Sequence, residues 1–259
     1  MDYQTIIINE IPHGISITIN RLENQNTLNA ALITELTNVI CSTENNSSLR
    51  FIILKGQQGI FCTGMDFKEM SQLDLGSNTA EEFAEHYMGL LKQLASSSKI
   101  IISEINGKVM AGGIGLVAAS DIVIATPRSQ FSLSEALWGL LPANVLPYLI
   151  RRTGFQPAYF MTLTTQTIFA EEAKVLHLVD EVTEQTDEAL RKHLIRCSRL
   201  SEQTVKDLKN YFRKLWIINE NVEKLAVMEL ARLVQEPRVK NNIIKFIQEG
   251  KFPWEATHE

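Results

Sequence analysis

The stretch formed by residues 100–125 reads IIISEINGKVMAGGIGLVAASDIVIA and indicates the fold class of the chain. It begins with a run of isoleucines, continues through a glycine-rich turn into a short helical segment at 116–120, and ends in a second apolar strand at 121–125. A strand, a glycine turn, a helix and another strand form a unit in which the two strands run parallel. This stretch therefore predicts an α/β fold.

The segments around this stretch repeat the same alternation. Strands are expected at 5–9 and 15–20, joined by a Pro-His-Gly turn, and again at 51–55, with amphipathic helices at 29–42 and 80–96 between them. From 188 to 247 the pattern is almost wholly helical. We therefore expect a core formed by residues 1–185 and a C-terminal helical region formed by residues 186–259.

The composition argues against some classes of binding partner. The chain has 259 residues, 45% of them hydrophobic, and a net charge of −5 from 25 basic and 30 acidic residues. This balance predicts neither a nucleic-acid partner nor a membrane-surface helix. No apolar run approaches the roughly 18 residues of a membrane span, and the N-terminus resembles a first strand rather than a signal peptide. We expect a cytoplasmic protein.

The cysteines predict neither a disulfide framework nor a metal site. Cys41, Cys62 and Cys197 are odd in number and widely spaced, which argues against both disulfides and a zinc site. No spacing of the H-x-x-x-H kind occurs either. We expect no metal and no cofactor.

Two glycine turns offer backbone donors. In FCTGMDFKEM, residues 61–70, Gly64 permits a positive φ and lets the Met65 amide point into a cavity. Gly112 and Gly113 open a helix whose free N–H groups favour a developing negative charge. Two such donors converging on one carbonyl oxygen make an oxyanion hole. Each turn alone also fits an ordinary connection between elements, and neither matches a dinucleotide or P-loop motif.

One carboxylate follows these turns. Glu135 stands among Phe131, Leu133, Leu137 and Trp138, and apolar surroundings disfavour the charged form of a carboxyl group. Such a group suits general acid/base chemistry near neutral pH. The alternative is a solvent-exposed glutamate at a helix start. No G-x-S-x-G elbow is present, which argues against nucleophilic catalysis.

Four ordered motifs carry a resemblance to a known family. They are the N-T-L-N segment at 26–29, F-x-x-G-x-D-x-x-E-M at 61–70, N-G-x-x-x-x-G-G with a later D-I at 106–122, and F-x-x-x-E-x-x-x-G-x-x-P at 131–142. This order resembles the enoyl-CoA hydratase/isomerase (crotonase) superfamily. The resemblance implies a ββα spiral core with a C-terminal α-helical trimerisation region, in homotrimers or dimers of trimers.

The resemblance also implies roles for individual residues. The oxyanion-hole amides fall on Met65 and Gly112, and Glu135 aligns with the second of the two hydratase glutamates. The first aligns with Gly115, so activation of water by two carboxylates is not implied. Residues expected to bind substrate are Asp66, Lys68, Gly113 and Asn144. Asn144 is expected to bind a distal carboxylate or the leaving hydroxyl, and the alternative is a buried asparagine at a helix start.

A closer resemblance covers residues 131–154, 159–165 and 249–255. These segments are similar to the PksH-type enoyl-CoA hydratase homologues of polyketide β-branching cassettes. The resemblance implies dehydration of 3-hydroxy-3-methylglutaryl-acyl carrier protein to 3-methylglutaconyl-acyl carrier protein, with a carrier-protein or CoA thioester as substrate. Because carrier proteins are acidic, a basic rim is expected, for which Lys68, Arg151, Arg152 and Lys251 are candidates.

Two other functions fit the same residues. A Δ3,Δ2-enoyl-CoA isomerase shuttles one proton with one carboxylate and tolerates Gly115. A non-catalytic scaffold of the same fold would need neither the glycine turns nor Glu135, so their presence favours an enzyme.

Overall fold

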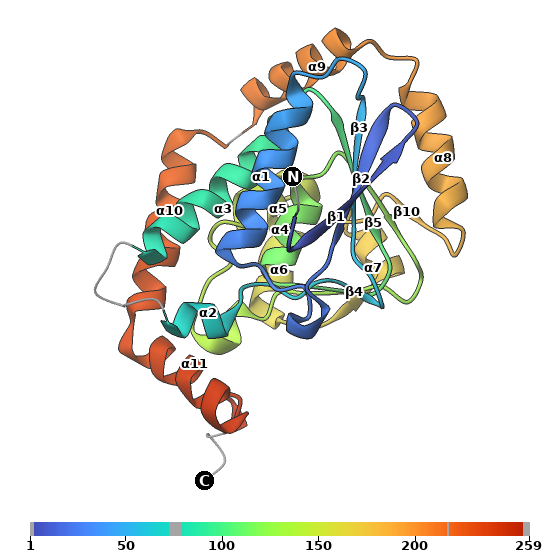
Figure 1. Ribbon diagram of the computed structural model, residues 1–259. Coiled ribbons are helices and arrows are strands. Elements are labelled where there is room, and N and C mark those ends of the chain that lie inside the picture. The colour runs from blue at the N-terminus through green and yellow to red at the C-terminus, as the bar shows by residue number, and fades with distance from the viewer. Residues whose placement is uncertain (1–2, 73–78, 217, 256–259) are drawn as a thin grey trace.

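A computed structural model describes residues 3–72, 79–216 and 218–255 (Figure 1). Its larger sheet has the strand order β1-β2-β3-β5-β7-β10. The strands are β1 (Ile6–Ile11), β2 (Gly14–Ile19), β3 (Phe51–Lys55), β5 (Ile100–Ile105), β7 (Ile122–Ala125) and β10 (Glu181–Val182). β1 pairs with β2 as an antiparallel hairpin, and the other neighbours are parallel. The expected α/β core is confirmed.

Helices cover both faces of this sheet because its strands are apolar on both. In β3, Ile52 and Leu54 face the main core, while Phe51 and Ile53 face a second cluster with Leu190. The main core lies under α1 (Ala30–Glu44), α3 (Thr79–Ser96), α4 (Gly112–Ala119), α5 (Leu146–Thr153) and α6 (Phe155–Thr164). The second cluster lies under α8 (Thr186–Cys197) and α9 (Glu202–Leu215). Figure 1 shows α1 and α3 on one side of the sheet and α8 on the other.

A smaller sheet, not expected from the sequence, positions the site. Its strand order is β4-β6-β8-β9. The strands are β4 (Ile60–Cys62), β6 (Lys108–Met110), β8 (Gln130–Ser132) and β9 (Ile168–Phe169). β4, β6 and β8 are parallel, so their C-terminal ends lie at one edge. The segments that follow these three strands therefore emerge side by side.

The C-terminal helices pack on the chain's own core. α10 (Glu220–Gln235) lies against α3, and α11 (Pro237–Glu249) contacts α2 (Phe67–Gln72) and the 3₁₀ turn η2 (Glu135–Trp138). Leu230, Val234 and Ile243 are buried in the main core. The remaining short elements are η1 (Leu22–Asn24) and α7 (Ala170–Val175). In Figure 1, α11 extends from the body of the molecule toward the C-terminus.

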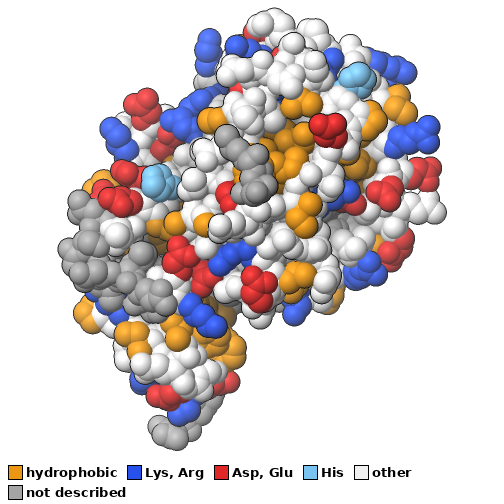
Figure 2. All heavy atoms as spheres, viewed as in Figure 1, with side chains coloured by type: hydrophobic (Ala, Val, Ile, Leu, Met, Phe, Trp, Pro, Cys, Tyr) orange, Lys and Arg blue, Asp and Glu red, His pale blue; other side chains and the backbone are white. Residues whose placement is uncertain are grey.

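The surface is mixed in charge. Acidic and basic side chains alternate over the face seen in Figure 2, and no broad field of one sign forms there. Within the described residues, no helix combines the length and the apolar character needed to cross a membrane.

Candidate active site

A cavity of about 540 Å³ opens at the C-terminal edge of the smaller sheet. Its wall includes the segments that follow β4, β6 and β8, which carry Met65, Gly112 and Glu135 respectively. Helices α3, α10 and α11 supply the other side, with Tyr87, Leu230 and Phe246 among the lining residues. The three residues expected to be catalytic therefore line one space.

The Met65 amide is free to point into this cavity. Leu28 forms an isolated parallel bridge with Met65, in which the Leu28 amide donates to Gly64 O at 2.7 Å and the Asp66 amide donates to Leu28 O at 2.9 Å. Because successive amides in extended backbone face opposite ways, the Met65 N–H faces away from Leu28. Within the described residues, this amide donates to no other group.

The Gly112 amide is the first of α4 and is likewise without an acceptor among the described residues. It follows Ala111, whose φ of 48° and ψ of −122° are unusual for a residue with a side chain. Backbone strain of this kind costs about 1–3 kcal/mol and clusters at functional sites. Here it turns the chain sharply from β6 into α4, at the point where Gly112 lines the cavity.

Glu135 presents a buried carboxyl oxygen. It opens η2, and its backbone carbonyl accepts a hydrogen bond from the Leu140 amide at 3.0 Å. Its Oε2 is buried and has no hydrogen-bond partner among the described residues. Burial raises the pKa of Glu135 from 4.5 to about 7, a value that suits a proton carrier at neutral pH. The exposed helix-start alternative is not what the structure shows.

Asn144 places a second unpartnered oxygen at the cavity. Its Nδ2 donates to the Ala84 carbonyl at 2.7 Å, while its buried Oδ1 has no partner within the described residues. Because only the amide nitrogen can donate to a carbonyl, the Ala84 contact assigns the oxygen to the other side. Asn144 therefore offers a hydrogen-bond acceptor to the cavity, not a donor.

Asp66 is engaged in holding the loop. Its Oδ2 pairs with Arg21 Nη2 at 3.0 Å and accepts from Thr27 Oγ1 at 3.0 Å, while Oδ1 accepts from the Lys68 and Glu69 amides at the start of α2. Burial alone would raise the pKa of this carboxyl, but hydrogen bonds from Arg21, the Glu69 amide and Thr27 hold it below its ordinary value. Asp66 stays ionised and fixes the position of Met65 beside it.

Lys68 and Gly113 take different positions. Lys68 is exposed and lies at the wall of the cavity. Gly113 packs against β4, where a Cβ would overlap the Cys62 carbonyl. Its lack of a side chain therefore lets α4 approach β4 closely, which keeps Gly112 near Met65.

Two of the four residues expected to form a basic rim point into the fold instead. Arg151 donates to the Ala118 carbonyl at 2.6 Å and lies 4.3 Å from the Trp216 ring centroid. Arg152 donates to the Ser120 carbonyl at 3.0 Å and pairs with Asp180. Both guanidinium groups are used inside the fold, so Arg151 and Arg152 do not belong to the rim. Lys68 is exposed and stays a candidate for the rim. Lys251 is also a candidate, and it forms an ion pair with Glu249 at 3.1 Å.

Two features of the site have no signal in the sequence. Tyr87 enters the cavity wall from α3, because its place on the buried face of that helix is set by packing. The rings of Trp138, Phe67, Phe246 and Phe252 form an aromatic wall, with Trp138 4.9 Å from Phe67 and 5.0 Å from Phe246 between centroids. This wall joins α2, η2 and the C-terminal segment, which are distant along the chain.

The described residues give little support to catalysis by a cysteine nucleophile or by a metal ion held on side chains. Burial raises the pKa of Cys62 to about 12, so its thiol stays protonated and is a poor nucleophile. No group of three or more His, Cys, Asp or Glu side chains in the described ranges is placed to hold a metal ion. Glu135 lines this cavity and has a pKa of about 7.

Comparison with known proteins shows the family of the chain. The enoyl-CoA hydratase/isomerase family model matches residues 10–257. The chain is 37% identical to the bacillaene synthase dehydratase PksH of Bacillus subtilis over 253 residues, which cover 98% of this chain and 97% of that protein. It is 27% identical to the mevalonyl-coenzyme A hydratase sidH of Aspergillus fumigatus, with 94% and 92% covered.

Solved structures give the same result. The crystal structure of a polyketide biosynthesis enoyl-CoA hydratase (pksH) from Bacillus subtilis matches with a TM-score of 0.90 and 35% sequence identity. The match covers 97% of this chain and 100% of that chain. An enoyl-CoA hydratase from Mycobacterium avium has a TM-score of 0.84 and 27% identity, covering 98% and 100%. The resemblance inferred from four motifs is confirmed, and the chain belongs to the enoyl-CoA hydratase/isomerase family.

Proposed function

We propose that this protein is a hydro-lyase that removes water from a 3-hydroxy-3-methylglutaryl thioester carried on an acyl carrier protein, giving the 3-methylglutaconyl thioester. One observation carries the proposal: Glu135, whose buried Oε2 has no hydrogen-bond partner among the described residues, lines the same cavity as two unpartnered backbone amides. Similarity to the dehydratase PksH along nearly the whole chain supports the choice of substrate.

The proposed elimination uses one carboxylate for both proton transfers. The Met65 and Gly112 amides donate to the thioester oxygen and stabilise the enolate that forms when the Glu135 carboxylate takes the α-proton. The neutral Glu135 then gives this proton to the 3-hydroxyl, the C–O bond breaks, the α,β double bond forms and water leaves. Glu135 returns to its ionised form. Its pKa of about 7 lets one group act first as base and then as acid.

Asn144 is proposed to orient the leaving hydroxyl. Its buried Oδ1 accepts hydrogen bonds, and a hydroxyl has a proton to donate, whereas an ionised carboxylate has none. Of the two roles expected for Asn144, binding of the hydroxyl therefore fits and binding of a distal carboxylate does not. Lys68 is proposed to meet the negatively charged part of the substrate or its carrier, while Asp66 and Gly113 support the loop around Met65 and Gly112.

The assembly is proposed to be a homotrimer or a dimer of trimers, with residues 186–259 as its helical region. Large apolar side chains are exposed on α6 and on α9 and α10, with Phe155 65%, Leu163 67% and Leu225 67% exposed. Exposed apolar side chains gathered on helices favour contact with another subunit. Light scattering on the purified protein tests this, since a monomeric mass contradicts it.

The decisive experiment for function is a mass measurement. The protein is incubated with 3-hydroxy-3-methylglutaryl carrier protein, and loss of one water that Glu135→Gln abolishes supports the dehydratase. A surface variant, Glu172→Gln on α7, serves as the matched control. No mass change, together with migration of the double bond in a 3-enoyl-CoA, would replace this proposal with isomerisation. Activity on neither substrate would favour the scaffold.

A further inference from the structure

Gly115 is a glycine in the interior of α4, where glycine costs about 1 kcal/mol relative to alanine. Its neighbours explain this choice. A Cβ at Gly115 would overlap the Tyr87 hydroxyl and would lie 3.2 Å from Tyr87 Cζ and 3.2 Å from Val145 Cγ2. The space that a side chain at 115 would occupy is therefore already filled by the tyrosine.

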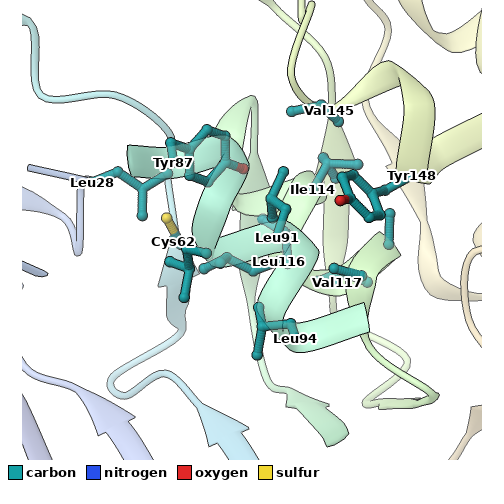
Figure 3. Packing of buried hydrophobic residues seen from close by; sticks show 14 of the residues in the cluster. Leu28, Cys62, Tyr87, Leu91, Leu94, Ile114, Leu116, Val117, Val145 and Tyr148 are labelled. Atoms are coloured by element: carbon teal, nitrogen blue, oxygen red, sulfur yellow. The ribbon is translucent and has the colours of Figure 1, made fainter. Parts of the chain in front are cut away.

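The Tyr87 hydroxyl has a defined partner there. The side chain is 3% exposed and lines the cavity, and its hydroxyl donates to the Gly112 carbonyl. Figure 3 shows this hydroxyl directed away from Leu28, toward the side of the cluster where Ile114 and Val145 lie. Burial and then the neighbouring acidic groups, Glu135 among them, raise the pKa of Tyr87 well above its ordinary value. The phenol is thus always protonated and able to donate.

The hydrogen bond from Tyr87 matters for the position of Gly112. Gly112 has no side chain of its own, follows the strained Ala111, and supplies one of the two proposed oxyanion donors. A hydrogen bond to its carbonyl fixes the position of the residue, and with it the amide nitrogen one Cα away. Catalytic donors have to be held within about 0.5 Å of their productive positions to be effective.

On the basis of the proposed function, we propose that Tyr87 is a positioning residue for the Gly112 donor and that its hydroxyl occupies the space that a side chain at 115 would need. The tyrosine and a side chain at 115 exclude each other. This pair leaves no room for a carboxyl side chain at 115, and Glu135 serves as the proton carrier.

The functional test is Tyr87→Phe, which keeps the buried ring and removes the hydroxyl. We expect kcat to fall about 10- to 100-fold with KM changed less than about twofold, somewhat below the loss caused by deleting an oxyanion donor outright. Tyr148→Phe is the matched control, because it removes another buried tyrosine hydroxyl of the same core but leaves the hydrogen bond from Tyr87 to the Gly112 carbonyl in place. A kcat for Tyr87→Phe equal to that of Tyr148→Phe overturns the positioning role.

A spectroscopic readout separates this inference from the choice of substrate. The ultraviolet absorption of a bound conjugated enoyl-CoA shifts to longer wavelength when its carbonyl is polarised by the two amides. We expect this shift in the wild-type protein and a smaller one in Tyr87→Phe, even if the carrier-bound substrate is not dehydrated. In that case the proposed function fails and the role of Tyr87 stands. Equal shifts in both proteins overturn the role of Tyr87 and leave the dehydratase intact.

A double-mutant cycle tests the exclusion without any ligand. Gly115→Ala should lower the melting temperature by roughly 5 °C more when residue 87 is tyrosine than in the Tyr87→Phe background, because the overlapping hydroxyl is absent there. Additive losses in the two backgrounds contradict the proposed competition for one space.

Discussion

Gly64 and Ala111 are in direct contact through the space where a side chain at 64 would stand. A Cβ on Gly64 would lie 2.6 Å from Ala111 Cβ and 3.4 Å from the Gly112 nitrogen. The turn after β4 and the turn after β6 are thus packed against each other without a gap. This contact sets the distance between the Met65 and Gly112 amides. An oxyanion hole requires a fixed distance, because both amides have to donate to the same oxygen.

Gly64→Ala should therefore lower kcat by more than the loss of folding stability in this variant accounts for. The added methyl group meets Ala111, and the φ of +94° at Gly64 is unfavourable for alanine. We expect kcat to fall by at least about 10²-fold, as for loss of one oxyanion donor. Gly59→Ala is the control, since it has a φ of +79° but open space around its Cβ. Similar kcat values for the two variants would contradict the role of the contact.

The activity should follow the ionisation of Glu135. Because the proposed reaction begins with the carboxylate as base, kcat/KM should rise with pH and level off above a midpoint of about 7. Glu135→Gln should lower kcat by about 10²–10⁴-fold and remove this pH dependence. The measurement is initial rate of water loss against pH. A rate that falls through the same midpoint would show that Glu135 starts as the acid instead.

The same carboxyl group should make the protein less stable at high pH. Its pKa is about 7 in the folded chain and near 4.5 when unfolded, so its contribution to stability is full below pH 4.5 and is lost as the pH rises through 7. We expect Glu135→Gln to exceed wild type in free energy of unfolding by about 2–3 kcal/mol near pH 8, and to match it near pH 4.5. Denaturant unfolding at the two pH values checks this. A difference independent of pH would disprove the linkage.

Loss of the Asp66 carboxylate should destabilise the loop. Asp66→Asn leaves Arg21 buried without its ion partner, which costs about 3 kcal/mol. Because the pKa of Asp66 is lowered, its stabilisation is present above pH 3.8 and is lost as the pH falls through the folded pKa. The exposed Asp207→Asn is the control, and urea unfolding at neutral pH is the measurement. Equal stability of the two variants would contradict the buried pair.

Asn144→Ala tests the acceptor at the leaving hydroxyl. We expect kcat to fall about 10-fold through loss of one hydrogen bond to the reacting group. Asn144→Ser, which retains a smaller acceptor, should restore part of this loss. The comparison uses single-turnover rates of water loss. Full activity of the alanine variant would remove Asn144 from the site.

Much of the fold follows from patterns within short windows of the chain. The strands β2, β3, β5 and β7 and the helices at 30–44 and 79–96 lie within one or two residues of the expected positions, because apolar periodicity in each segment reports which face is buried. The two-residue strand β10 was not expected. The smaller sheet was missed, since β4, β6 and β8 are too short to show a period. Burial of the Arg151 and Arg152 guanidinium groups was missed as well, because it depends on carbonyls more than 25 residues away.

By itself, the sequence determined the α/β class, the family, the two glycine turns, the candidate acid/base Glu135 and the glycine at 115. Only the tertiary structure decided that the segments after three parallel strands meet at one edge, that Asp66 is tied to Arg21, and that Tyr87 fills the space beside Gly115. The physical reason is that residue types and local periodicity are properties of short segments. Burial, free backbone donors and a shifted pKa arise only when segments distant along the chain exclude water from the same space.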